Sequence, residues 1–323
     1  MAIQESLYLG VDIGGTKVAA GLVDGQGQIL MRTRTAMPAR GDAEGALAAV
    51  SKVIGEALAA GQGRPVVAIG LSSPGPLDPR SGVVLNPPNL PCWRNYPLAE
   101  RVHAAHRLRT WLDNDANAAA LAEARWGAGR EFGSVFYATL GTGIGAGWVL
   151  AGAVHHGRTG AAVEGGHVTI DHRGARCACG KRGCIEAVAA GPAVGARARR
   201  LARRHPDEAK QLLALAGGEL RRINAERVGT AWRAGDGLAG RVLEETATLL
   251  GIWLGSIVDL LEPEVIIFGG GMGALMAEWF PSIQRHLQAW SINPRAHEIP
   301  LRAARYGEEA GIAGGAALCL QSA

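Results

Sequence analysis

Residues 7–24, LYLGVDIGGTKVAAGLVD, decide the predicted fold because they combine two apolar strands with a tight turn. The runs LYLGVDI and VAAGLVD have strand length, and the Gly-Gly turn between them predicts a hairpin. Asp12 lies at the end of the first strand, and Gly14, Gly15, Thr16 and Lys17 follow it. Backbone amides and lysine bind phosphate oxygens, and a carboxylate binds magnesium or its waters. The turn is therefore a candidate site for the phosphates of a magnesium–nucleotide complex.

Two further glycine-rich turns follow apolar strands later in the chain. SVFYATLGTGIGAGWVLAG (134–152) repeats the order strand, turn, strand, with exposed amides expected at Thr142, Gly143 and Gly145. EVIIFGGGMG (264–273) is a third apolar strand, which ends in Gly269, Gly270 and Gly271. Neither of the first two turns fits the P-loop pattern G-x-x-x-x-G-K-[ST], and the second lacks the strand-to-helix setting of a dinucleotide fingerprint. Glycine-rich hairpins also occur for purely structural reasons, so each turn alone leaves both interpretations open.

The rest of the chain mixes helices and strands. Helical patterns cover 43–60, 116–129, about 240–261 and the small-residue segment 307–320, while VVAIGLSS (66–73) and TWLDND (110–115) are typical of strands. Residues 74–91 are rich in Pro, Gly and Asn and predict a loop. Two strand–turn–strand units among helices and strands predict a duplicated α/β architecture of two lobes with a central cleft.

Composition and charge favour an ordinary globular protein. The 323 residues are 48% hydrophobic and 19% charged, with a formal net charge of +4. The basic run 197–205 alternates with Ala and Leu at helical spacing, so we interpret it as a solvated helix face rather than a patch for nucleic acid. The sequence shows neither the pattern of a secretory leader nor an apolar run of membrane-spanning length. We therefore expect a cytoplasmic protein that binds neither nucleic acid nor a membrane.

The strongest local signal is a histidine followed by three cysteines, His167-x9-Cys177-x-Cys179-x4-Cys184. The chain has five cysteines, and an odd number with a tight group of three argues against a disulfide framework. One imidazole and three thiolates form a closed tetrahedral set that suits Zn²⁺. Because four protein ligands leave the ion no open position, the pattern predicts a structural zinc loop and disfavours a zinc hydrolase.

Carboxylates occur beside the zinc loop and at the end of a predicted strand. Glu164 and Glu186 bracket the metal ligands in sequence, where they are either fixed acceptors for sugar hydroxyls or ordinary surface groups. Asn114-Asp115 joins a strand to a helix. At such a junction Asp115 either caps the helix or acts as a general base that takes a proton from an attacking hydroxyl. Spacing alone does not separate these alternatives.

Taken together and in this order, the motifs resemble those of the ROK family, a group of sugar kinases and sugar-responsive repressors with the actin-like ATPase (ribonuclease H-like) fold. The resemblance runs from the strand with Asp12 to the final helix and so covers nearly the whole chain. Its motifs are VDIGGTK (11–17), SPGP (73–76), NDANA (114–118), LGTGIGAG (140–147), EGGH (164–167) and CACGKRGCIE (177–186).

The resemblance implies a role for each motif. The turn from Asp12 to Lys17, with Thr142, Gly143 and Gly145, would bind the phosphates of ATP and Mg²⁺, and Gly269 to Gly271 would lie against adenosine. Asp115 would be the catalytic base. The sugar would be held by Gly75, Asn89, Asn114, Asp115, Glu164, His167 and Glu186. His167 would bind zinc through one ring nitrogen and the sugar through the other. Val163 is a departure, because the family usually has Gly at this position.

We expect a kinase rather than a repressor, because only about six residues precede the first strand and a DNA-binding module needs more. A sugar-binding regulator without catalysis would be expected to lack the base or the phosphate turns, and Asp12, Lys17 and Asp115 are present. The residues of these motifs are most similar to those of the glucokinase branch, which predicts ATP-dependent phosphorylation of the 6-hydroxyl of glucose. Fructose, N-acetylmannosamine and N-acetylglucosamine are the alternative acceptors, and the sequence does not fix the sugar.

The resemblance also implies a domain division and an assembly. The small lobe would comprise 1–117 and 303–323, and the large lobe would comprise 118–302 with the zinc loop at 164–186. Closure of the lobes around the sugar would exclude water. A homodimer or homotetramer is expected.

Overall fold

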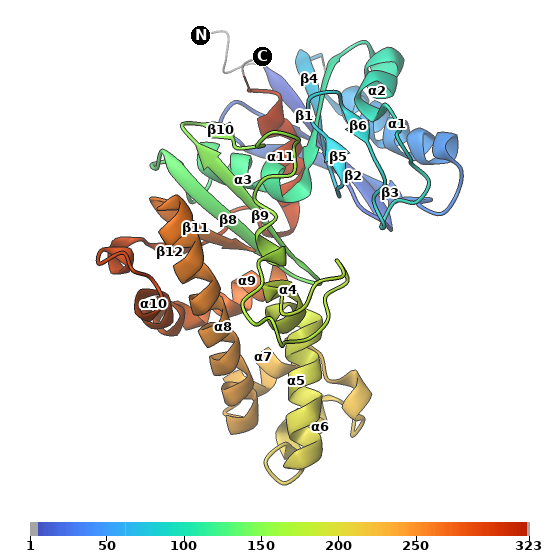
Figure 1. Ribbon diagram of the computed structural model, residues 1–323. Helices are drawn as coiled ribbons and strands as arrows, with labels where there is room; N and C mark the ends of the chain where they lie inside the picture. Colours follow the sequence, from blue (N-terminus) through green and yellow to red (C-terminus); the bar gives the residue numbers. More distant parts are fainter. Residues whose placement is uncertain (1–5, 62, 322–323) are drawn as a thin grey trace. The chain divides into compact units, whose positions relative to one another are not determined.

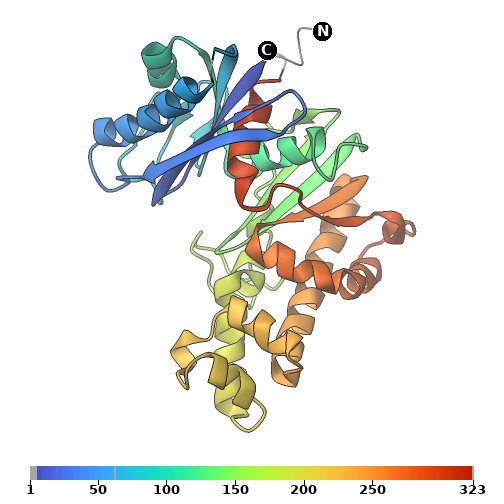
Figure 2. The same cartoon turned by 180° about the vertical axis from the view of Figure 1, so that it is seen from behind.

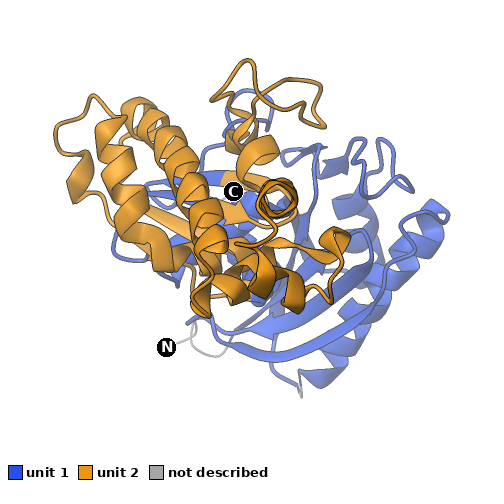
Figure 3. Cartoon of the chain, turned by 90° about the horizontal axis from the view of Figure 1, so that it is seen from below, with its two compact units in different colours: residues 1–137, 147–163, 308–323 blue, residues 138–146, 164–307 orange. Residues whose placement is uncertain are grey.

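The computed structural model describes residues 6–61 and 63–321, and the chain divides into two compact units (Figure 3). Unit 1 comprises Met1–Tyr137, Gly147–Val163 and Glu308–Ala323, and unit 2 comprises Ala138–Ala146 and Glu164–Gly307. These units differ from the lobes expected above, because the whole helix after Asn114 and the segment Gly147–Val163 belong to unit 1. The division into functional lobes stays a prediction.

A five-stranded sheet with the order β3-β2-β1-β4-β7 forms the centre of unit 1 (Figure 1). Its strands are β1 (Leu7–Ile13), β2 (Lys17–Val23), β3 (Ile29–Ala36), β4 (Val66–Ser73) and β7 (Arg109–Asn114). The pairs β1–β2 and β2–β3 are antiparallel, whereas β1–β4 and β4–β7 are parallel. The hairpin of β1 and β2 and the strand at 66–73 confirm the sequence predictions. These strands were predictable because each is a continuous apolar run.

One prediction for unit 1 needs correction. The segment 74–91, expected as a loop, contains a small antiparallel hairpin of β5 (Leu77–Asp78) and β6 (Val83–Val84). Strands of two residues are too short to show an alternating pattern, so only the surrounding Pro and Gly residues were visible in the sequence.

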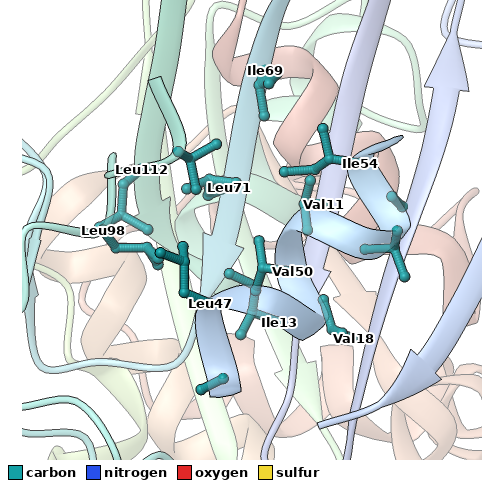
Figure 4. Packing of buried hydrophobic residues seen from close by; sticks show 14 of the residues in the cluster. Val11, Ile13, Val18, Leu47, Val50, Ile54, Ile69, Leu71, Leu98 and Leu112 are labelled. Carbon is teal, nitrogen blue, oxygen red and sulfur yellow. The ribbon is translucent and has the colours of Figure 1, made fainter. Parts of the chain in front are cut away.

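Helices cover both faces of this sheet. α1 (Ala43–Ala60) and α2 (Leu98–His106) contribute to the core on one face, where Val11 and Ile13 of β1 meet Leu47, Val50 and Ile54 of α1 (Figure 4). The first residue of α1 follows Asp42, whose side chain accepts a hydrogen bond from Gly45 N at 2.6 Å and caps the helix. Because successive residues of a strand point to opposite faces, the residues between the core positions of β1 face the other way.

The second face of the sheet packs against α11 (Ala310–Leu318), which in turn packs on α3 (Asp115–Arg125). Glycine is required where this last helix meets the strands. A Cβ added at Gly70 of β4 would lie 1.8 Å from Gly315 O, and one at Gly10 of β1 would lie 1.8 Å from Ile312 O. The backbones of helix and sheet therefore approach each other directly, and the C-terminal helix closes the core of unit 1 (Figure 2).

Unit 2 is mainly helical. Its helices are α4 (Ile185–Ala189), α5 (Gly191–Arg204), α6 (Lys210–Leu215), α7 (Ala225–Arg233), α8 (Gly237–Leu261), α9 (Gly270–Met276) and α10 (Phe280–Ala289). The long helix α8 confirms the helix predicted near 240–261, and it packs against α5, α7 and α10. Asp236 caps its first turn by accepting a hydrogen bond from Ala239 N at 2.8 Å. Within the described part of the chain, no helix is both long enough and apolar enough to cross a membrane.

A second five-stranded sheet has the order β10-β9-β8-β11-β12. It contains β8 (Ser134–Leu140), β9 (Ile144–Leu150), β10 (Ala153–Val154), β11 (Val265–Gly269) and β12 (Leu301–Ala303). β8 and β9 flank the second glycine turn, as the repeated strand–turn–strand pattern predicted.

The interpretation of the basic run 197–205 as a solvated helix face is wrong for its first residue. Arg197 lies on α5 but is only 6% exposed. Its Nε is 2.8 Å from Glu245 Oε1, and its guanidinium also donates to Val188 O at 2.7 Å and to Thr246 Oγ1 at 2.9 Å. A buried guanidinium needs such partners, because an unpaired charge in the interior is strongly destabilising.

Candidate functional site

The first glycine turn is a closed loop between β1 and β2 of unit 1. Gly14 N donates to Lys17 O at 2.9 Å, and Thr16 O accepts from Met37 N at 3.0 Å, which fixes the turn from both sides. The side chains of Thr16 and Lys17 are exposed. A Cβ at Gly15 would lie 2.8 Å from Asn89 O, so the turn packs directly on the residue predicted as a sugar ligand. A hydroxyl and an ammonium group thus project from a rigid backbone.

Asp12 lies in β1, two positions before Gly14, and the pKa of its side chain is shifted. Burial raises the pKa of the Asp12 carboxyl group, and the nearby ammonium group of Lys17 opposes that shift. The last helix forms part of the surroundings, because a Cβ at Gly311 would lie 2.4 Å from Asp12 Oδ1. The sequence analysis did not identify Gly311, since nothing local to the terminal helix indicates that it meets β1.

The end of β7 brings three predicted sugar-site residues into one place. A Cβ at Gly75 would lie 3.4 Å from Asn114 Nδ2, and Asp115 is the next residue of the chain. Asn114 is the N-cap of α3 and accepts from Ala116 N at 2.9 Å. Asp115 is the first residue of α3; its side chain is exposed, and its Oδ1 accepts from Ala116 N at 2.8 Å. Asn114 therefore occupies the N-cap position, and the Asp115 carboxylate contacts the same amide in the first turn.

Directly before these residues lies Asp113, a buried carboxylate whose pairing with the partly buried His156 the sequence analysis missed. Asp113 Oδ2 lies 2.6 Å from His156 Nε2, and the exposed fractions of the two side chains are 2% and 22%. Asp113 Oδ1 accepts from Asn117 Nδ2 at 3.1 Å. The two partners are 43 positions apart, so no local pattern reveals them.

The second glycine turn belongs to unit 2 and lies against Glu186. Gly141 N donates to Gly143 O at 2.9 Å within the turn, and Ile144 N donates to Glu186 Oε2 at 3.0 Å. A Cβ at Gly143 would lie only 2.6 Å from the same carboxylate oxygen. The turn therefore fixes the orientation of the Glu186 side chain, and the exposed hydroxyl of Thr142 lies between the two glycines.

The third glycine segment lies at the beginning of α9. Gly270 has φ = 77°, a conformation that glycine adopts without steric cost. A Cβ there would lie 2.4 Å from Leu140 O. The segment from Gly269 to Gly271 therefore lies beside the end of β8, next to the second glycine turn.

The four predicted metal ligands come together in unit 2. One ligand atom from each of His167, Cys177, Cys179 and Cys184 can be chosen so that all four lie within 4.8 Å of one another. Cys179 Sγ is 3.6 Å from Cys184 Sγ, and Cys177 Sγ is 3.6 Å from His167 Nδ1. Zinc bonds of about 2.3 Å to sulfur and about 2.0 Å to nitrogen, arranged tetrahedrally, place ligand atoms roughly 3.5–3.8 Å apart. The residues present therefore fit a zinc ion.

Glycines shape the zinc loop, defined here as residues 164–186. Gly180 and Gly183 have φ values of 94° and 64°, in the left-handed region that other residues rarely adopt. A Cβ at Gly183 would lie 1.5 Å from Asp171 O, so the chain crosses itself closely. Cys177 N donates to Lys181 O at 2.9 Å, which closes the hairpin that carries the cysteines.

Glu186 and His167 meet beside the metal ligands. Glu186 Oε1 lies 3.5 Å from Cys177 Sγ and 3.9 Å from His167 Nδ1. His167 turns its Nδ1 toward the cysteines, so Nε2 is the nitrogen that remains for a second partner. Glu164 is exposed, and its carbonyl oxygen accepts from His167 N at 3.0 Å.

Comparison with known proteins identifies the family. The sequence profile of the ROK family matches residues 8–322. The chain belongs to the ROK family. The ROK glucokinase from Streptomyces griseus, crystallised with glucose and AMPPNP, is 36% identical with a TM-score of 0.82, and the alignment covers 97% of this chain and 98% of that chain. This ROK protein has the actin-like ATPase fold.

Two further relatives bear on the substrate of this ROK protein. A glucokinase from Streptomyces coelicolor is 34% identical over 97% of each chain. An N-acetylmannosamine kinase from Yersinia pseudotuberculosis is 32% identical, with 95% of this chain and 96% of that protein covered. Kinases for two different sugars are thus similar to the chain over nearly its full length.

Proposed function

We propose that this ROK protein is an ATP-dependent glucokinase, which transfers the γ-phosphoryl group of ATP to the 6-hydroxyl of glucose. The observation that carries the proposal is the near full-length similarity to a glucokinase crystallised with glucose and an ATP analogue. The residues that this chemistry needs are present in this chain: a carboxylate at the end of β7, two glycine turns and a carboxylate fixed beside a metal-ligand set.

The assignment of roles follows the family motifs, and the chemistry of each group supports it. Asp115 would accept the proton of the attacking hydroxyl, because its carboxylate is exposed at a strand–helix junction. Gly75, Asn89, Asn114, Glu164, His167 and Glu186 would hold the sugar. His167 Nε2 would donate to or accept from a sugar hydroxyl while Nδ1 binds the metal, and Glu186 would accept from another hydroxyl.

The glycine turns are assigned to the nucleotide. Amides of Gly14, Gly15, Gly143 and Gly145, with Thr16, Lys17 and Thr142, would bind the phosphates, and Gly269 to Gly271 would border adenosine. Asp12 would hold Mg²⁺ directly or through its waters, and the ion would neutralise charge on the phosphate oxygens. Transfer of a phosphoryl group depends mainly on positioning and on such charge neutralisation.

A coupled assay for ADP release tests the proposal. Glucose, fructose, N-acetylmannosamine, N-acetylglucosamine and allose are each supplied with Mg-ATP, and kcat/KM is compared. We expect glucose to give the highest value and 6-deoxyglucose to give no turnover, because it lacks the acceptor hydroxyl. A higher kcat/KM for N-acetylmannosamine would favour the second candidate function, an N-acetylmannosamine kinase. The similarity to the relative from Yersinia pseudotuberculosis supports this candidate. No ADP release with any sugar would favour a sugar-binding regulator.

The family resemblance further suggests a cytoplasmic homodimer or homotetramer. Both statements remain predictions. Sedimentation velocity at micromolar concentration distinguishes a monomer from either assembly.

A further inference from the structure

The buried pair of Asp113 and His156 has no role in the reaction as proposed. The distance of 2.6 Å between Asp113 Oδ2 and His156 Nε2 is that of a strong charge-assisted hydrogen bond. An ionised carboxylate only accepts, so the imidazole donates through Nε2. Since Asp113 is 2% exposed, removal of His156 would leave Oδ2 of a buried carboxyl group without its hydrogen-bond partner. The hydrogen bond to Asp113 therefore fixes the position of the His156 side chain.

Asp113 itself is held by two elements of unit 1. It lies in β7 opposite Ser72 of β4, one position before Asn114. Its Oδ1 also accepts from Asn117 Nδ2 of α3 at 3.1 Å. A residue that lies in a strand of the sheet and also accepts a hydrogen bond from a helix is a suitable anchor for a loop.

The loop anchored in this way comprises residues 156–163, here called the strap. Arg80 donates to Gly157 O at 3.0 Å and to Arg158 O at 3.1 Å. Ala162 N donates to His156 O at 3.2 Å, which closes the strap on itself. Every one of these contacts lies within unit 1. The strap is thus fixed at its beginning and along its backbone.

The strap ends in a strained residue. Val163 has φ = 62°, in the left-handed region, where a β-branched side chain is a steric outlier. Such a conformation persists only when the surrounding structure enforces it. Gly adopts the same backbone without this cost. Val163 is followed directly by Glu164, a proposed sugar ligand, so the backbone at Val163 sets the direction of Glu164.

We propose that Asp113 and His156 are positioning residues that, through the strap, hold Val163 in its left-handed conformation and so orient Glu164 toward the sugar. The inference rests on the proposed sugar-kinase function. Without the pair, Val163 relaxes to negative φ and Glu164 turns away from its position. The variant Val163→Gly has no such tendency, so the pair contributes less to the position of Glu164 in that background.

The test is a double-mutant cycle on KM for glucose with the variants His156→Ala, Val163→Gly and their combination. We expect His156→Ala to raise KM by about tenfold, equivalent to about 1.4 kcal/mol, which is a typical magnitude for a strained residue. In the Val163→Gly background the same change should raise KM by less than about threefold. His156→Gln should stay close to wild type, because its amide nitrogen also donates to Asp113.

His155→Ala is the matched control. His155 precedes His156, but it is exposed and contacts the Trp148 ring at a centroid distance of 5.1 Å instead of pairing with a buried carboxylate. This variant should have the KM of wild type. Equal rises in KM for His156→Ala in both backgrounds would overturn the proposal, because they would mean that the pair does not act through Val163.

A second measurement separates this inference from the proposed function. Hydrogen exchange at the Ala162 amide should become faster in His156→Ala and stay unchanged in His155→Ala, because this amide closes the strap. Unchanged protection in His156→Ala would overturn the role of the pair, whatever the enzyme activity. If the wild-type protein phosphorylates no sugar but the two histidine variants show the expected difference in exchange, the proposed function is refuted and the anchored strap is retained.

Discussion

Among the single residues, Asp115 has the role that one substitution tests most directly. Asp115→Asn keeps the size and the hydrogen-bonding oxygen of the side chain but removes the basic carboxylate. We expect kcat to fall by about 10²–10⁴, the usual contribution of a general base, while glucose binding measured by calorimetry largely survives. Asp207→Asn, at a residue in an exposed ion pair with Lys210, is the control. Retention of more than about a tenth of the wild-type kcat would contradict a base role for Asp115.

The raised pKa of Asp12 predicts that the stability of the fold depends on pH. Burial raises its pKa above the ordinary value of 3.8, so the contribution of Asp12 to stability is present below pH 3.8 and is lost as the pH rises through the raised pKa. Asp12→Asn removes this loss. The variant should therefore unfold at a higher temperature than wild type at pH 7, and the two should converge as the pH falls toward 3.8.

The same substitution should weaken nucleotide binding. KM for Mg-ATP is expected to rise by about tenfold or more, since a hydrogen bond or ligand bond with a charged group contributes about 1.5–3 kcal/mol. Differential scanning calorimetry and initial rates measure the two effects. A variant that is less stable than wild type at pH 7 would show that Asp12 contributes to the fold and not only to the site.

At the scale of elements, the zinc loop has the clearest prediction. Cys179→Ser removes one of four ligands, and a structural zinc site contributes about 10 kcal/mol or more to folding of its surroundings. We expect substoichiometric zinc by atomic absorption and a raised KM for glucose, because Glu186 lies against Cys177 and His167. Cys92→Ser is the matched control, since Cys92 is outside the cluster. Full zinc content with normal KM in Cys179→Ser would exclude the structural role.

The elements differ in how far the sequence predicts them. β1 and β4 were predictable because each is a continuous apolar run, and α1 because its apolar residues have helical spacing. The hairpin of β5 and β6 was not, because two-residue strands have no period. The ligands of the zinc loop were predictable for another reason: their spacing along the chain is itself the chemical pattern, and only its exact geometry needed the fold.

At the scale of the molecule, segments far apart in the sequence, β1 and β4 on one side and α11 on the other, pack together in unit 1. Gly70→Ala would place a Cβ 1.8 Å from Gly315 O of α11. Since backbone atoms cannot give way as a side chain does, we expect a loss of about 1–3 kcal/mol or more in the free energy of unfolding by urea. Gly55→Ala is the control: no atom lies within 4 Å of its Cβ, so it should gain about 0.5–1 kcal/mol from helix propensity. Equal stability of both variants would mean that α11 does not close this core.

The sequence by itself determined the features written in short stretches of chain: the strand–turn–strand units, the CCCH ligand set and the family motifs that carry Asp12 and Asp115. Only the tertiary structure decided which distant residues meet. It placed Gly311 against Asp12, Glu186 against the second glycine turn and His156 against Asp113. It also showed that Val163, visible in the sequence as a departure from the family, has a left-handed backbone. The physical reason is that periodicity and ligand spacing are local, whereas close packing and charge pairing depend on how separate segments come together.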